Sequence, residues 1–187
     1  MNLFEFLMVL VSIIIGLGLA ELLTGVAGLI RERGQVRTYW VHSLLILALF
    51  LAMLQQWWEA WGLQSTSEWT FIGLSMMLAG PICFFLIIHL MFPRPLTSYR
   101  DLADYYYERT RPVWWLAATA VTVSTLFRPL VFDMQLVTMD NFASLPVLII
   151  CVLAATFRNR ALHGVLVTLL VGFILFDILG RSYQITG

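Results

Sequence analysis

Six long apolar runs divide this chain, and their length is the strongest constraint on its fold. They cover residues 3–30, 39–58, 69–92, 112–132, 142–157 and 162–180, separated by charged, proline-containing or polar segments. About 20 apolar residues in a helix cross the hydrocarbon core of a bilayer, and a helix satisfies its own backbone hydrogen bonds there. We therefore predict an all-α, polytopic integral membrane protein, with six transmembrane helices in a single domain over residues 1–187.

Composition supports this class and argues against others. Hydrophobic residues make up 60% of the chain and charged residues 12%, and the formal net charge is zero. The mean hydropathy of +0.87 is far above that of a soluble domain. The basic residues, all arginine, are scattered, so we expect the lipid bilayer and not nucleic acid as a partner. The two cysteines, Cys83 and Cys151, have no metal-site spacing and read as buried thiols.

The distribution of arginine predicts the orientation in the membrane. Loops that follow odd-numbered runs are rich in arginine, which is typical of cytoplasmic loops. We therefore expect both termini outside (N-out, C-out) and a multi-pass protein of a prokaryotic inner membrane. The arginines on that side are Arg31, Arg33, Arg37, Arg94, Arg100, Arg109, Arg111, Arg158 and Arg160.

The longest loop precedes the fourth run. Ser98, followed by Asp101, has the pattern of a helix N-cap, and three tyrosines follow at 105–107. We predict a short interfacial helix over residues 98–108, with the tyrosines resting at the membrane surface.

The first run contains small residues at every fourth position. Such a stripe lets another helix approach closely, either in the same chain or in a neighbouring copy. We expect a homo-oligomer or a membrane partner subunit. The helix-packing stripe consists of Ser12, Gly16, Ala20, Thr24 and Gly28.

Glu21 lies ten residues before Arg31 in the first run. That separation is about 15 Å along a helix, which places the carboxylate near the middle of the membrane. There it must be protonated, paired with a cation or exposed to a water-filled cavity. One interpretation is an ion or proton site, and the other is a neutral acid that hydrogen-bonds a neighbouring helix.

The three histidines, His42, His89 and His163, all fall near the predicted cytoplasmic ends of their runs. Imidazole binds haem iron and several metals, but none of the three has a nearby companion ligand in the sequence. We therefore expect no metal site and no cofactor, with haem as an alternative. A simpler hypothesis is that His42 or His89 hydrogen-bonds Glu21 and completes a short proton relay.

A second group of charges gathers toward the predicted outer side. Opposite charges inside apolar helices are cheapest when they pair, so an ion pair between Arg128 and Asp177 is expected. The group is either a structural latch or part of an outer vestibule. This outer charge cluster consists of Glu59, Arg128, Asp133, Asp177 and Arg181.

No catalytic motif can be assembled from the sequence, so we do not expect an enzyme. The first functional hypothesis is a channel or a proton- or ion-coupled transporter with an intramembrane carboxylate. The alternative is a non-catalytic membrane subunit or sensor that acts through partner binding. A haem-binding redox protein is the third. No motif is specific enough to indicate a family.

Overall fold

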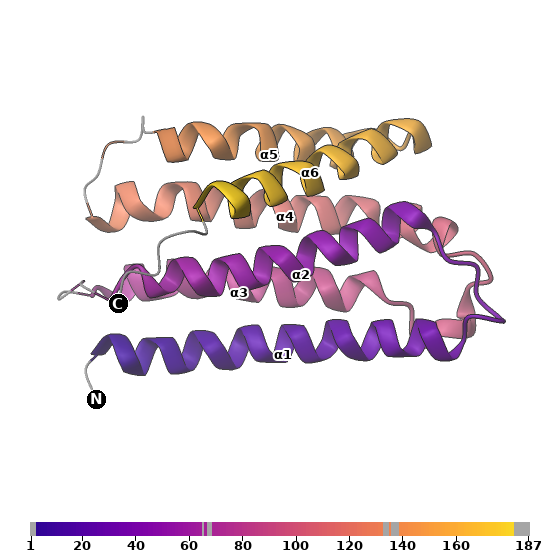
Figure 1. Ribbon diagram of the computed structural model, residues 1–187, viewed down its shortest axis with the longest axis horizontal. Helices are drawn as coiled ribbons and strands as arrows, with labels where there is room; N and C mark the ends of the chain where they lie inside the picture. The colour runs from indigo at the N-terminus through magenta and orange to yellow at the C-terminus, as the bar shows by residue number, and fades with distance from the viewer. Residues whose placement is uncertain (1–2, 65, 67–68, 133–134, 136–138, 182–187) are drawn as a thin grey trace.

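The fold is a bundle of long helices that run side by side (Figure 1). A computed structural model describes residues 3–64, 66, 69–132, 135 and 139–181. Within that part the prediction of an all-α protein is confirmed. The helices are α1 (Leu3–Arg31), α2 (Trp40–Trp61), α3 (Phe71–Met91), the short 3-10 helix η1 (Leu96–Ser98), α4 (Leu102–Phe132), α5 (Met139–Thr156) and α6 (Arg160–Arg181).

Three helices begin at a side-chain cap that the local sequence supplies. The Thr70 hydroxyl accepts a hydrogen bond from Gly73 N at the start of α3, at 3.0 Å. Asp101 Oδ1 accepts from Ala103 N, at 2.8 Å, at the start of α4. Asn159 does the same for α6. Each cap satisfies backbone donors that have no partner inside the helix, and so fixes where the helix starts.

Four helices of the described residues, α1, α2, α3 and α6, are long and apolar enough to span a membrane. The apolar part of α5, Ser144–Thr156, is shorter. The second half of α4 is rich in threonine, and the hydroxyls of Thr119, Thr122 and Thr125 donate to carbonyl oxygens one turn earlier. These bonds satisfy polar groups within the helix, which makes them compatible with an apolar surrounding. Six spans and their orientation remain predictions.

The bundle has a definite order of neighbours. The first helix packs against α2 and α3, α4 packs against α3 and α5, and α6 packs against α2 and α5. The start of α1 and the end of α6 lie at the same end of the bundle (Figure 1). A continuous apolar core runs between these helices, with Met53, Ile88 and Val167 fully buried.

The longest loop differs from its prediction. Residues 98–108 do not form a separate helix, because α4 begins after the Asp101 cap and continues through Pro112 to Phe132. Tyr105 and Tyr106 are only 6% and 3% exposed, so they lie inside the bundle and not on its surface.

The small-residue stripe of α1 is only partly an intrachain packing surface, where Ser12 Oγ accepts a hydrogen bond from Trp57 Nε1 of α2 at 3.0 Å. Gly28 is buried against Leu96, but Gly16, Ala20 and Thr24 are exposed. The cause is geometric: a step of four residues turns a helix by about 400°, so a strict four-residue repeat drifts by about 40° at each step. The face that packs alternates steps of three and four, and comprises Phe4, Met8, Val11, Ile15, Gly18 and Leu22.

The arginine-bearing loops, residues 32–39, 92–101 and 157–159, meet at one end of the bundle, which we call the arginine-rich end (Figure 1). Arg37 N donates to Arg100 O at 2.8 Å, and Leu102 N donates to Arg37 O at 3.1 Å. Arg160 lies 3.8 Å from Asp104 of α4. These contacts join segments that are far apart in the sequence into one cap.

Candidate functional site: a cavity between five helices

A cavity of about 280 Å³ lies between α2, α3, α4, α5 and α6. It is lined mostly by the inward faces of α2 and α4, and α3, α5 and α6 complete its walls. A wider hollow of about 620 Å³ lies between α1 and α2, where Phe4, Trp57 and Trp61 line it. Only two helices form that surface groove, so the five-helix cavity is the better candidate for a site.

Polar side chains line this cavity toward the end opposite the arginine-rich end. Gln55 Nε2 donates to Glu59 Oε1 at 3.2 Å and also to Asp177 Oδ2, and so joins α2 to α6. On the opposite wall the hydroxyls of Thr125 and Ser144 are hydrogen-bonded to each other at 2.8 Å, which joins α4 to α5. Each pair belongs to two different helices, so a relative movement of those helices changes the polar wall.

Gln56 is the most informative polar residue of the cavity. Its Oε1 atom is buried and has no hydrogen-bond partner among the described residues. Its amide lies against Gly80 of α3, where a Cβ atom would collide with it. A buried acceptor without a partner costs about 1–3 kcal/mol. The site therefore favours a ligand that can donate a hydrogen bond.

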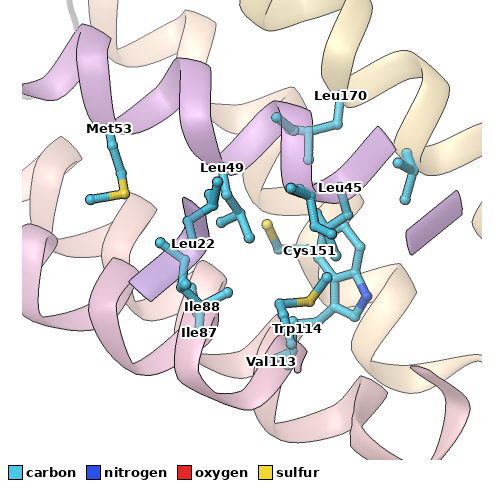
Figure 2. Packing of buried hydrophobic residues seen from close by; sticks show 14 of the residues in the cluster. Leu22, Leu45, Leu49, Met53, Ile87, Ile88, Val113, Trp114, Cys151 and Leu170 are labelled. Atoms are coloured by element: carbon cyan, nitrogen blue, oxygen red, sulfur yellow. The ribbon is translucent and has the colours of Figure 1, made fainter. Parts of the chain in front are cut away.

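Toward the arginine-rich end the cavity becomes apolar. Leu45, Leu49, Val113, Trp114 and Cys151 lie close together there (Figure 2). This apolar floor contrasts with the polar wall. The cavity is therefore polar at one end and apolar at the other.

Below the floor, hydrogen bonds connect Trp114 to the arginine-rich end. Trp114 Nε1 donates to the Tyr106 hydroxyl at 3.3 Å, and that hydroxyl lies 2.8 Å from His163 Nδ1. His163 Nε2 lies 2.7 Å from Phe157 O, which can only accept, so Nε2 carries the proton and Nδ1 accepts from Tyr106. Burial raises the pKa of the Tyr106 hydroxyl, which keeps it a neutral donor.

The sequence contains a signal for this cavity in the spacing of the residues of α2, which the charged residues alone do not reveal. Cavity-lining residues of α2 follow alternating steps of three and four residues, which is the spacing of one helix face. The polar members of that face, Gln56 and Glu59, come at the end of the row. The row consists of Leu45, Leu49, Ala52, Gln56 and Glu59.

Glu21 of α1 contacts an arginine just after α3 and a histidine in the last turn of α3. Its Oε1 atom contacts Arg94 Nη2 and lies 3.2 Å from His89 Nδ1. Gly25 packs against Phe92, so α3 ends about one turn beyond Glu21, and the carboxylate lies nearer to an end of the bundle than its distance from Arg31 suggested. Glu21 does not line the five-helix cavity.

The three histidines lie in different environments in the structure. His89 contacts Glu21, as one of the two relay hypotheses expected. His42 instead lies with Nε2 2.7 Å from Met91 O, and His163 is held by Tyr106 and Phe157. Within the described part of the chain, no group of three or more histidine, cysteine, aspartate or glutamate side chains could hold a metal ion.

The structure brings part of the predicted outer charge cluster together. Glu59 and Asp177 share Gln55 as a hydrogen-bond donor at the cavity wall. Arg128 lies on α4 and Arg181 ends α6, but their side chains are outside the described part of the structure, as is the whole of Asp133. The expected pair between Arg128 and Asp177 therefore stays a prediction.

No family model matches the chain, and no match was found among curated proteins or solved structures.

Proposed function

We propose that this protein is an inner-membrane channel or ion-coupled transporter whose site is the five-helix cavity. In this proposal all six helices cross the membrane, the arginine-rich end is cytoplasmic, and both termini are outside. The cavity then faces outward with its polar wall. A small ion or a polar solute with hydrogen-bond donors would bind there.

The distribution of polar groups inside the cavity supports this proposal most directly. Gln55, Gln56 and Asp177 lie at one end of it, and Trp114 lies at the other. Polar groups buried inside a membrane bundle are costly and commonly mark a pathway for ions or solutes. A stable core alone has no need of an unpartnered amide oxygen beside a cavity.

In this proposal Glu21 is not the functional carboxylate. Arg94 and His89 contact Glu21, and its side chain is not part of the cavity lining. We therefore assign Glu21 a structural role and place the solute-binding role on the polar wall.

The test is flux through proteoliposomes that contain pH-sensitive and cation-sensitive dyes. Ala52 and Ala117 line the cavity, so Ala52→Phe and Ala117→Phe should fill it and abolish flux. Ala27→Phe, on an exposed position of α1, is the matched control and should keep wild-type flux. Wild-type protein that moves no ion or solute under several gradients, or filled-cavity variants that conduct normally, would contradict the proposal.

The alternative, a non-catalytic subunit or sensor, is favoured by one observation. Gly16, Ala20 and Thr24 form an exposed face of small residues on α1. Such a face permits close contact with another membrane helix. Gentle solubilisation followed by mass spectrometry would identify a stably bound partner.

A further inference from the structure

A second, very small chamber lies beyond the apolar floor of the cavity. Its volume is about 10 Å³, and Val113 lines both this chamber and the main cavity. About that volume holds one water molecule. The polar side chains around the chamber are those of His42, Tyr105, Tyr106, Arg109 and Thr110.

His42 is the buried polar group of this chamber whose bonding is incomplete. The residue is 1% exposed, and its Nε2 atom lies 2.7 Å from Met91 O. A carbonyl oxygen can only accept, so Nε2 carries the proton in the neutral ring and Nδ1 keeps a lone pair. Nδ1 is buried and has no hydrogen-bond partner among the described residues.

His42 also continues the cavity face of α2. It lies three residues before Leu45, which lines the main cavity, so the row of alternating three- and four-residue steps extends to it. The same helix face therefore presents Gln56 and Glu59 on one side of the apolar floor and His42 on the other. This face of α2 forms a line through the bundle, with polar side chains at both of its ends.

We propose that His42 Nδ1 is a proton-binding station on this line, so that the species carried or coupled is the proton. This inference rests on the proposed function and names its ion. A hydronium ion in the chamber transfers a proton to Nδ1. One O–H bond of hydronium breaks, an N–H bond forms on the ring, and a water molecule remains. Release toward the arginine-rich end reverses the step: the N–H bond breaks and water becomes hydronium.

The surroundings set the conditions for this exchange. The protonated ring keeps its hydrogen bond from Nε2 to Met91 O, which strengthens when the donor is charged. From α4, Tyr105 and Tyr106 present hydroxyls to the chamber, and Arg109 lines it with a guanidinium that is 47% exposed and lies 3.7 Å from Glu108 Oε1. Leu90 and Met91 of α3 line the chamber, and the ring of Phe92, just after α3, lies edge-on to His42. Burial of the His42 ring disfavours its charged form, so a proton bound there is released readily, as a transfer station requires.

The test is proton flux into proteoliposomes under an imposed membrane potential. His42→Gln keeps an amide donor but cannot bind a proton near neutral pH, so proton flux should fall to the level of protein-free liposomes. His89→Gln is the matched control and should keep wild-type flux, because His89 is 47% exposed and lies outside the chamber.

The outcomes distinguish the two proposals. If Ala52→Phe blocks proton flux but His42→Gln does not, the role of His42 is overturned and the cavity keeps its function. If the wild type moves another solute without protons, the proton station is again overturned alone. If the wild type moves nothing, both fail.

A second measurement does not depend on a substituted protein that folds. In wild-type protein with ¹⁵N-labelled histidine, the Nδ1 resonance of His42 should show protonation as the pH is lowered. His163, with both ring nitrogens already hydrogen-bonded, should keep its neutral form over the same titration. A His42 resonance that shows no protonation while the protein stays folded would overturn the proposal.

Discussion

At the scale of single residues, the intramembrane carboxylate shows why a charge cannot be interpreted without its partners. The sequence indicated that the Glu21 carboxylate, inside an apolar run, must be paired with a cation, protonated or exposed to water. It did not indicate Arg94, because that residue lies in a loop after the third apolar run. Since α3 ends beside Gly25, the loop brings Arg94 back to Glu21. The pair ties the start of that loop to α1.

The ion pair makes a prediction about stability. Glu21→Gln and Arg94→Gln should each destabilise the protein by about 1 kcal/mol, the upper range for partly exposed pairs. The double variant should be no less stable than the worse single variant, because both remove the same interaction. Thermal unfolding in detergent measures this. Fully additive losses would show that the two side chains act independently.

Proton and ion flux should survive in Glu21→Gln at matched reconstitution, because the cavity does not include this residue. Ala27→Phe serves as a second conducting reference in the same assay. Loss of flux in a well-folded Glu21→Gln protein would return the functional site to α1.

At the scale of helices, the glycines of α1 have different environments although they lie close in sequence. A Cβ atom at Gly18 would collide with Met53 of α2 and approach Ile88 of α3. At Gly16 no atom of the described residues lies within 4 Å of that position. Gly18 thus packs closely against α2 within the chain, whereas Gly16 faces outward.

Two leucine substitutions separate these roles. Gly18→Leu should destabilise the bundle by about 1–3 kcal/mol through overpacking. Gly16→Leu should leave the melting temperature unchanged and, if copies associate through this face, shift the protein toward monomers. Thermal unfolding and cross-linking in liposomes provide the readouts. A cross-linked dimer that persists in Gly16→Leu would place self-association on another surface.

Tyr106 joins α4 to α6 through His163 and also accepts a hydrogen bond from Trp114. Tyr106→Phe leaves two buried polar atoms without a partner, and should cost about 1–3 kcal/mol of unfolding free energy. Tyr99→Phe is a suitable control, because Tyr99 lies on the surface and its hydroxyl bonds Glu108. Equal stability of the two variants would contradict a structural role for the buried chain.

Sequence patterns predicted the helical class and where most of the helices lie, although α4 begins at Leu102, before the apolar run at 112–132. The length of each apolar run and the charged residues between the runs determine these two predictions. Run length and charge spacing are both local properties of the sequence. The floor of the cavity was not predictable in this way, because the burial of Trp114, which is 1% exposed, depends on how the helices pack and not on its local sequence. Its burial depends on α4 continuing through Pro112, which places the tyrosines and Trp114 on one inward face. Glu59 and Asp177, which the sequence analysis grouped by depth, both accept a hydrogen bond from Gln55.

At the scale of the whole molecule, the arginine-bearing loops gather at one end, as the predicted topology requires. Labelling with a membrane-impermeant maleimide in intact cells tests the orientation. Gln64→Cys, between α2 and α3, should react from outside, and Gln35→Cys, between α1 and α2, should react only after the membrane is opened. Both side chains are exposed, so access depends on the side of the membrane. The opposite pattern would invert the topology.

The loop cap has a mechanical consequence. Backbone hydrogen bonds between Arg37 and the segment 100–102 fasten the helices at the arginine-rich end. At the other end, side chains bridge neighbouring helices, as Gln55 does to Asp177 and Thr125 to Ser144. Helices that are fastened together at one end move relative to one another most at the other end. We therefore expect a tilt of the helices about the loop cap to change the polar wall more than the cap itself.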